Sequence, residues 1–184
     1  MLGVFNLDKI YQYLLIAVGF LLPLTVFGAN VFIVIIVVLW FVSGDYKSKY
    51  SQIISSRILI ASIAFYILHV IGMLWTEDLA WGFHMLHKMW YFLVLYPVLH
   101  TIVKREYIKY YVLAFLLALL ITEIYSYLIW FEFVPPPAFR GGNVLVSNPI
   151  PYMTHVSYNP ILAFAIYLVA HAVFINQALS KTKL

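Results

Sequence analysis

A short basic cluster near the middle of the chain carries residue types that could bind a phosphate or diphosphate. His87 and Lys88 follow His84 by three and four residues, so the three share one face of an expected helix. That helix would begin after residues 75–78, where Thr76 can cap its amino end and the following acids favour its dipole. Lysine suits phosphate as a point charge, but the same cluster could instead mark the edge of a membrane. A zinc site from the two histidines and a carboxylate is a weaker alternative, because no His-Glu-x-x-His pattern is present.

A second group lies in the polar stretch between residues 132 and 155. Arg140 follows three prolines and precedes two glycines, so its planar fork can grip phosphate oxygens where the backbone approaches a ligand closely. His155 stands at an expected helix start, where the dipole disfavours the imidazolium and suits a neutral partner for a sugar hydroxyl. The alternatives are a loop charge beside a glycine turn and a hydrogen-bonded histidine at a membrane interface.

Ionisable residues also occur inside strongly apolar runs. Glu123 is costly in such a run and normally faces protein or water, so we expect it to pair with a cation from another helix. His69, His100 and His171 are expected to be neutral and hydrogen-bonded to neighbouring helices.

The composition requires that these residues be positioned by helices in a bilayer. The 184 residues are 65% hydrophobic and only 10% charged, which leaves too little polar material to cover a soluble domain. The absence of cysteine excludes disulfides, thiolate metal sites and a cysteine nucleophile. We therefore expect an all-α, polytopic transmembrane bundle that forms a single integral membrane domain over residues 1–184.

Six apolar runs predict about six crossings. They cover residues 13–27, 31–42, 58–74, 89–103, 110–131 and 156–175. The first two are short. Pro23 predicts a kink in the first, and residues 28–30 predict a tight turn between them. A single bent helix over residues 13–42 is the alternative, and it would reverse the orientation of everything downstream.

The distribution of basic residues predicts that both termini are cytoplasmic. With six crossings, nine of the eleven Lys and Arg residues lie inside, and only Lys88 and Arg140 lie outside. The inner residues are Lys9, Lys47, Lys49, Arg57, Lys104, Arg105, Lys109, Lys181 and Lys183. Topology thus accounts for most of the net charge of +4. We expect no nucleic-acid partner, because the basic residues form no continuous face.

Three short stretches and one basic residue resemble the bacterial O-antigen ligase and O-antigen polymerase family. The first is residues 72–78, a Gly-x-Leu-Trp-Thr-x-Asp pattern in which threonine stands where the family usually has serine. Lys88 follows as the basic residue that opens the next helix, and residues 90–97 continue that helix. Residues 148–158 are similar to the segment before a later helix in some members.

The resemblance implies the fold of the N-terminal half of a longer protein, with a C-terminal half as a further partner. It implies transfer of a glycan from undecaprenyl diphosphate to a lipid or sugar acceptor, without a cofactor or a required metal. The reaction would take place at the periplasmic face of the bacterial inner membrane, among membrane lipids, as part of lipopolysaccharide biosynthesis.

Such a glycosyltransferase needs cations over the diphosphate and a neutral base near the acceptor hydroxyl. We expect Lys88 and Arg140, with His84 and His87, to bind substrate, and His155 to be the catalytic base. The absence of paired carboxylates excludes a hydrolytic glycosidase. The alternative function is a non-catalytic membrane subunit or a small transporter-like protein.

Overall fold

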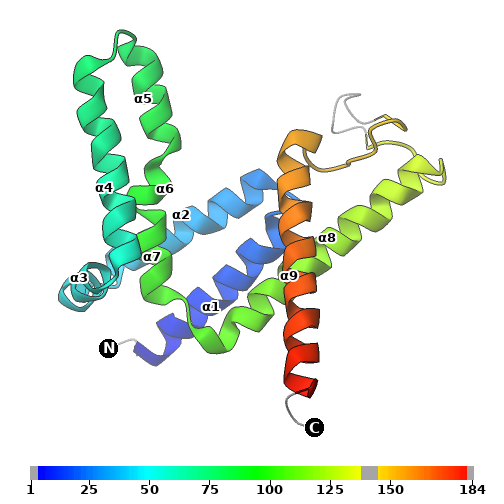
Figure 1. The fold of residues 1–184 in the computed structure, drawn as a ribbon, viewed down its shortest axis with the longest axis horizontal. Coiled ribbons are helices and arrows are strands. Elements are labelled where there is room, and N and C mark those ends of the chain that lie inside the picture. Colours follow the sequence, from blue (N-terminus) through cyan, green and yellow to red (C-terminus); the bar gives the residue numbers. More distant parts are fainter. Residues whose placement is uncertain (1–3, 138–144, 182–184) are drawn as a thin grey trace. The chain divides into compact units, whose positions relative to one another are not determined.

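The computed structural model describes residues 4–137 and 145–181, and within them the predicted all-α fold is confirmed. The described part of the chain forms helices and contains no strand. The elements are α1 (Val4–Leu21), α2 (Val26–Val42), α3 (Tyr46–Ser55), α4 (Arg57–Gly72), η1 (Met73–Trp75), α5 (Leu79–Lys88), α6 (Trp90–Leu93), α7 (Leu95–Ile102), η2 (Arg105–Tyr107), α8 (Ile108–Trp130) and α9 (His155–Lys181) (Figure 1).

The helices form two compact units. Unit 1 comprises residues 1–14 and 33–108, and unit 2 comprises residues 15–32 and 109–184. Helices α1 and α2 therefore contribute one part to each unit.

Within the described residues, three helical segments are long and apolar enough to cross a membrane. They are Arg57–Trp75, Arg105–Trp130 and His155–Phe174, which match the predicted runs at 58–74, 110–131 and 156–175. A fourth is reached if α2 and α3, which bend by 115° at their junction, count as one span. The predicted run at 89–103 is divided at Val94 into the short helices α6 and α7.

The turn between the first two helices differs from the predicted one. Residues 28–30 lie inside α2, and the chain turns instead at residues 22–25, which include Pro23. Proline cannot continue α1, because it lacks the N–H that an interior helix position donates. The Thr25 hydroxyl then accepts a hydrogen bond from the Gly28 backbone N–H at 3.1 Å and caps α2. The sequence predicted that Pro23 bends the first helix, but in the structure α1 ends at Leu21, before the proline.

Unit 1 is held together by hydrogen bonds from a few polar side chains. Ser62 of α4 donates to the Phe92 carbonyl at 3.0 Å, and Trp40 Nε1 of α2 donates to Thr101 Oγ1 of α7 at 2.7 Å. At one edge, Lys104 Nζ lies 2.6 Å from a carboxylate oxygen of Asp8. This hydrogen bond raises the pKa of the Lys104 ammonium above its ordinary value, because it favours the charged form.

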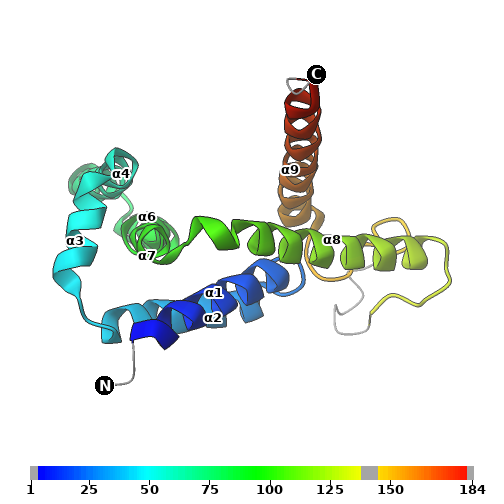
Figure 2. The same ribbon diagram turned by 90° about the horizontal axis from the view of Figure 1, so that it is seen from below.

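Unit 2 has its core where α9 crosses α8 (Figures 1 and 2). Leu119 of α8 packs with Met153 and with Tyr158 and Ala165 of α9, and all four are buried. Helix α1 approaches α8 closely, since a Cβ at Gly19 would lie 3.0 Å from the Tyr111 carbonyl oxygen.

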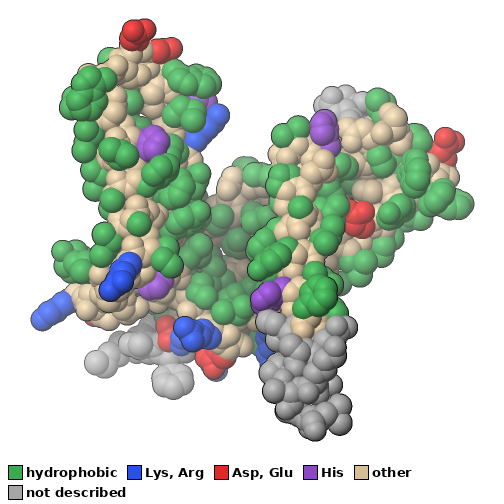
Figure 3. All heavy atoms as spheres, in the orientation of Figure 1, with side chains coloured by type: hydrophobic (Ala, Val, Ile, Leu, Met, Phe, Trp, Pro, Cys, Tyr) green, Lys and Arg blue, Asp and Glu red, His purple; other side chains and the backbone are tan. Residues whose placement is uncertain are grey.

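Most of the apolar surface of the long helices is not covered by the chain. In an 18-residue apolar stretch of Arg57–Trp75, only 6% is buried inside the molecule, and in the corresponding stretch of His155–Phe174 only 11% is buried. Figure 3 shows hydrophobic side chains over much of the visible face. Exposed apolar surface of this extent is what a lipid or another protein chain covers.

Candidate functional site

The main candidate site is a cavity of about 220 Å³ in unit 2, at the place where α9 begins against α8. Both helices and the segment before α9 contribute to its wall. The lining residues are Glu123, Ser126, Tyr127, Trp130, Pro149, Ile150, Tyr158, Asn159 and Leu162. The mixture of apolar, aromatic and a few polar side chains is typical of a small-molecule site.

A carboxylate and a phenol form the polar centre of this cavity. The hydroxyl of Tyr158, a residue only 2% exposed, donates a hydrogen bond to Glu123 Oε1 at 2.7 Å. Glu123 itself is half-buried in α8, a helix of membrane length. The partner from another helix is therefore a tyrosine hydroxyl, and the expectation of a cation is corrected. The phenol satisfies one carboxylate oxygen and leaves Oε2 to accept from a ligand.

Ser126 adds a hydroxyl that makes no hydrogen bond to the described residues. It lies three residues after Glu123 and so on the same face of α8. Its Oγ is buried and has no hydrogen-bond partner in the described part of the chain. By contrast, buried Thr122 on the same helix donates to the Ala118 carbonyl at 2.9 Å. An unpaired buried hydroxyl costs about 1–3 kcal/mol, and in a cavity wall it is a group that a ligand can pair.

Aromatic rings form the outer part of the wall. The centroids of the Tyr127 and Trp130 rings lie 6.1 Å apart at the end of α8, and both side chains are exposed. Aromatic faces carry negative electrostatic potential, so they attract cations and the polarised C–H groups of sugar rings. The cavity thus combines hydrogen-bonding groups with flat apolar faces.

His155 lies one turn from this cavity along α9. It is the first residue of the helix, as the sequence predicts, and its side chain is exposed. It precedes Tyr158 and Asn159 by three and four residues, so the three side chains share a helical face. The role of His155 as the catalytic base stays a prediction. Arg140, its predicted companion, lies outside the described residues.

The predicted phosphate-binding cluster belongs to unit 1. His84, His87 and Lys88 lie in α5 and are all exposed, and the His84 ring lies 5.5 Å from the ring of Trp81. His155 belongs to unit 2, so a common pocket for Lys88, Arg140 and His155 stays a prediction.

The start of α5 corrects the predicted cap. Asp78 is the N-cap, and its side chain accepts a hydrogen bond from the Trp81 backbone N–H at 2.9 Å. Thr76 instead is the residue that follows η1, two positions before Asp78, and its backbone is extended. The Asp78 carboxylate lies close enough to bond an N–H in the first turn of α5, whereas Thr76 lies too far along the chain.

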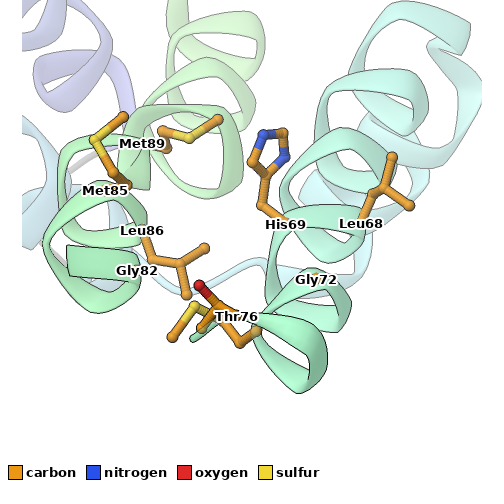
Figure 4. A pocket seen from close by; sticks show the side chains of 9 residues that line it. Leu68, His69, Gly72, Thr76, Gly82, Met85, Leu86 and Met89 are labelled. Atoms are coloured by element: carbon orange, nitrogen blue, oxygen red, sulfur yellow. The ribbon is translucent and has the colours of Figure 1, made fainter. Parts of the chain in front are cut away.

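A second cavity, of about 350 Å³, lies between α4 and α5 in unit 1 (Figure 4). Its lining residues are Leu68, His69, Gly72, Met73, Thr76, Gly82, Met85, Leu86 and Met89. The His69 ring nitrogen Nδ1 lies 2.8 Å from the Phe65 carbonyl, one turn back on the same helix. The prediction that His69 bonds to a neighbouring helix is therefore wrong for this nitrogen.

Neither cavity has the set of histidine and carboxylate side chains that zinc usually needs. In the described ranges no three His, Cys, Asp or Glu side chains are grouped so as to hold a metal ion. Comparisons of the chain with protein-family models, curated proteins and solved structures give no match. The chemistry of the site is therefore the basis for assigning a function.

Proposed function

We propose that the protein is a multi-pass protein of the bacterial inner membrane that binds a lipid-linked glycan and transfers it to a sugar acceptor. The observation that carries the proposal is the Glu123–Tyr158 hydrogen bond in the wall of the unit 2 cavity. An ionisable residue in a membrane-length helix is by default a functional residue. Here it lies beside the Ser126 hydroxyl, which has no partner among the described residues, and the exposed Trp130 ring. This set suits sugar hydroxyls and a sugar ring face.

The proposed reaction needs a base and a stabilised leaving group. The acceptor hydroxyl oxygen would attack the anomeric carbon while the bond to the diphosphate oxygen breaks. His155, as a neutral imidazole, would take the hydroxyl proton, and the carrier diphosphate would leave with the bonding electrons. Lys88 and Arg140 would stabilise the charge on the diphosphate. Glu123 and Ser126 would hold sugar hydroxyls and fix the ring for attack.

The proposal includes the topology predicted from the sequence, with six crossings and cytoplasmic termini. It requires residues 76–88 and residues 135–155 to be on the outer side of the membrane. The inward bias of lysine and arginine supports this arrangement. The short helices α6 and α7 would then complete one crossing together.

A binding measurement on the full chain tests the proposal. Purified protein in nanodiscs is titrated with an undecaprenyl-diphosphate-linked oligosaccharide, and the Glu123→Gln and Tyr158→Phe variants are compared with it. We expect Glu123→Gln to weaken binding about 10- to 100-fold, the equivalent of one charge-assisted hydrogen bond. Glu132→Gln is the matched control, because Glu132 is exposed just beyond α8 and does not line the cavity.

Activity is tested by complementation of a ligase-deficient strain, scored on its surface-polysaccharide ladder. We expect the wild-type chain, supplied with a C-terminal half where one is required, to restore the ladder and His155→Ala to abolish it. Failure of the nanodisc protein to bind the lipid-linked oligosaccharide would overturn the proposal.

The alternative of a transporter-like protein is favoured by one observation, the presence of Glu123 within a membrane-length helix. It predicts proton-driven solute uptake into proteoliposomes that is lost in Glu123→Gln and kept in Glu132→Gln. That result, without binding of the lipid-linked glycan, would favour transport.

A further inference from the structure

We propose that the cavity between α4 and α5 is a binding site for Cu(I), with His69, Met73, Met85 and Met89 as its ligands. This site is distinct from the cavity proposed to hold the sugar, because the two cavities have different lining residues and belong to different units.

Methionine is unequally distributed in the chain, and three of the five methionines line this one cavity. Of the other two, Met153 is buried in the core of unit 2 and Met1 lies outside the described residues. Thioether and imidazole groups are donors that suit Cu(I) better than harder ions. No carboxylate lines the cavity, so it lacks the charged oxygen ligands that usually bind magnesium and calcium.

The four donors come from two facing segments at matching intervals. His69 lies in the last turn of α4 and Met73 follows that helix directly, as the first residue of η1. Met85 lies in α5 and Met89 is the residue directly after it. Residues four apart lie on the same side of a helix. Figure 4 shows His69 extending from α4 toward the space between the helices, with Met85 and Met89 on the other side.

The hydrogen bond of His69 leaves its second ring nitrogen, Nε2, available to a metal ion. A carbonyl oxygen can only accept, so Nδ1 must carry the proton in its 2.8 Å contact with Phe65. In the neutral ring the free lone pair is then on Nε2. Metal-bound histidines commonly donate their other ring N–H to a backbone carbonyl in this way, which fixes the tautomer and the ring orientation.

Gly82 makes room for one of the thioethers. A Cβ at this position would lie 2.5 Å from Sδ and 2.8 Å from Cε of Met73. Any larger residue would therefore displace the Met73 sulfur. At Gly72, which also lines the cavity, an added Cβ would meet nothing within 4 Å. The two glycines form a matched pair for a test.

The first test is a Cu(I) titration of the full chain in detergent under reducing conditions, against a chromophoric Cu(I) chelator. Ag(I), which undergoes no redox change, is the second probe. We expect one ion per chain. Met85→Leu and Met89→Leu should each weaken binding at least about tenfold, since even changes to groups that only orient a metal ligand cost about that much. Met153→Leu is the control, because it replaces the methionine outside the cavity with a residue of similar volume.

The second test separates metal binding from packing. Methionine also fills irregular gaps in apolar cores, and leucine would replace it there without any effect on metal. We expect Gly82→Ala to weaken Cu(I) binding more than Gly72→Ala, with both variants still folded by circular dichroism. Absence of stoichiometric Cu(I) and Ag(I) binding to the wild-type chain would overturn the proposal, as would equal affinity in Met153→Leu and Met85→Leu.

Discussion

At the scale of single residues, Ser126 combines a cost in stability with a proposed role in binding. A buried hydroxyl in an apolar helix normally bonds back to a carbonyl one turn earlier, as Thr122 does with Ala118. The Ser126 hydroxyl has no such partner among the described residues and belongs to a cavity wall that also carries Glu123. The energetic cost of this arrangement is understandable if the hydroxyl serves a ligand.

Replacement of Ser126 by alanine should leave the fold intact and impair the site. We expect the free energy of unfolding in detergent to stay unchanged or to rise by up to about 1 kcal/mol, because an unpaired buried hydroxyl is removed. Binding of the lipid-linked oligosaccharide should weaken. Chemical denaturation followed by tryptophan fluorescence measures the first effect, and the nanodisc titration measures the second.

Thr122→Val is the control for this prediction, since it deletes a hydroxyl that is already paired. It should lower the free energy of unfolding by about 0.5–1.5 kcal/mol. If Ser126→Ala destabilises the protein as much as Thr122→Val, the Ser126 hydroxyl has a structural partner and is not available to a ligand.

At the scale of elements, helix ends are set by whichever side-chain oxygen reaches the first free N–H groups. Thr25 caps α2 and Asp78 caps α5, and in each case the oxygen accepts from the N–H three residues later. The sequence misplaced the start of α2, whereas for α5 it placed the start correctly and chose the wrong cap residue. Threonine, aspartate and glutamate can all interact favourably with a helix start, and only the backbone geometry distinguishes which of them is the cap.

The cap of α5 gives a direct prediction. Asp78→Ala should lower the free energy of unfolding by about 0.5–2 kcal/mol and accelerate hydrogen exchange in peptides covering residues 79–88. Thr76→Ala should change stability by no more than about 0.5 kcal/mol, because its side chain does not cap α5. The reverse order of the two variants, measured by thermal unfolding and exchange mass spectrometry, would contradict the assigned cap.

At the scale of the whole molecule, the dominant feature is a set of long helices whose apolar surfaces are mostly exposed. Such surfaces are stable in a bilayer, where every backbone group is satisfied within the helix. Composition thus predicts a membrane protein, in agreement with these helices. The number and direction of the crossings depend on which short helices pair, and cysteine labelling measures both.

The proposed topology predicts the accessibility of three positions. The chain contains no cysteine, so single cysteines can be introduced without a prior deletion. Cysteines at Glu77 and Glu132 should react with a membrane-impermeant maleimide added outside intact spheroplasts, and a cysteine at Lys104 only after lysis. Reaction of the Glu77 and Glu132 positions from opposite sides would exclude a shared outer site for α5 and the start of α9.

The sequence by itself determined the features that depend on residues close together in the chain. The helical class, three membrane-length segments and a helix that begins at His155 all follow from apolar runs and local turn chemistry. The reason is that hydrophobic periodicity and backbone preference act over a few residues.

Only the tertiary structure decided the partners of the polar residues. Glu123 meets Tyr158 across 35 residues of chain, and His69 shares a cavity with methionines on another helix. A carboxylate in an apolar run signals that some partner exists, but phenol, cation and water all satisfy it. Which one is present depends on how α8 and α9 pack, because a hydrogen bond requires two groups within about 3 Å and no local pattern encodes that distance.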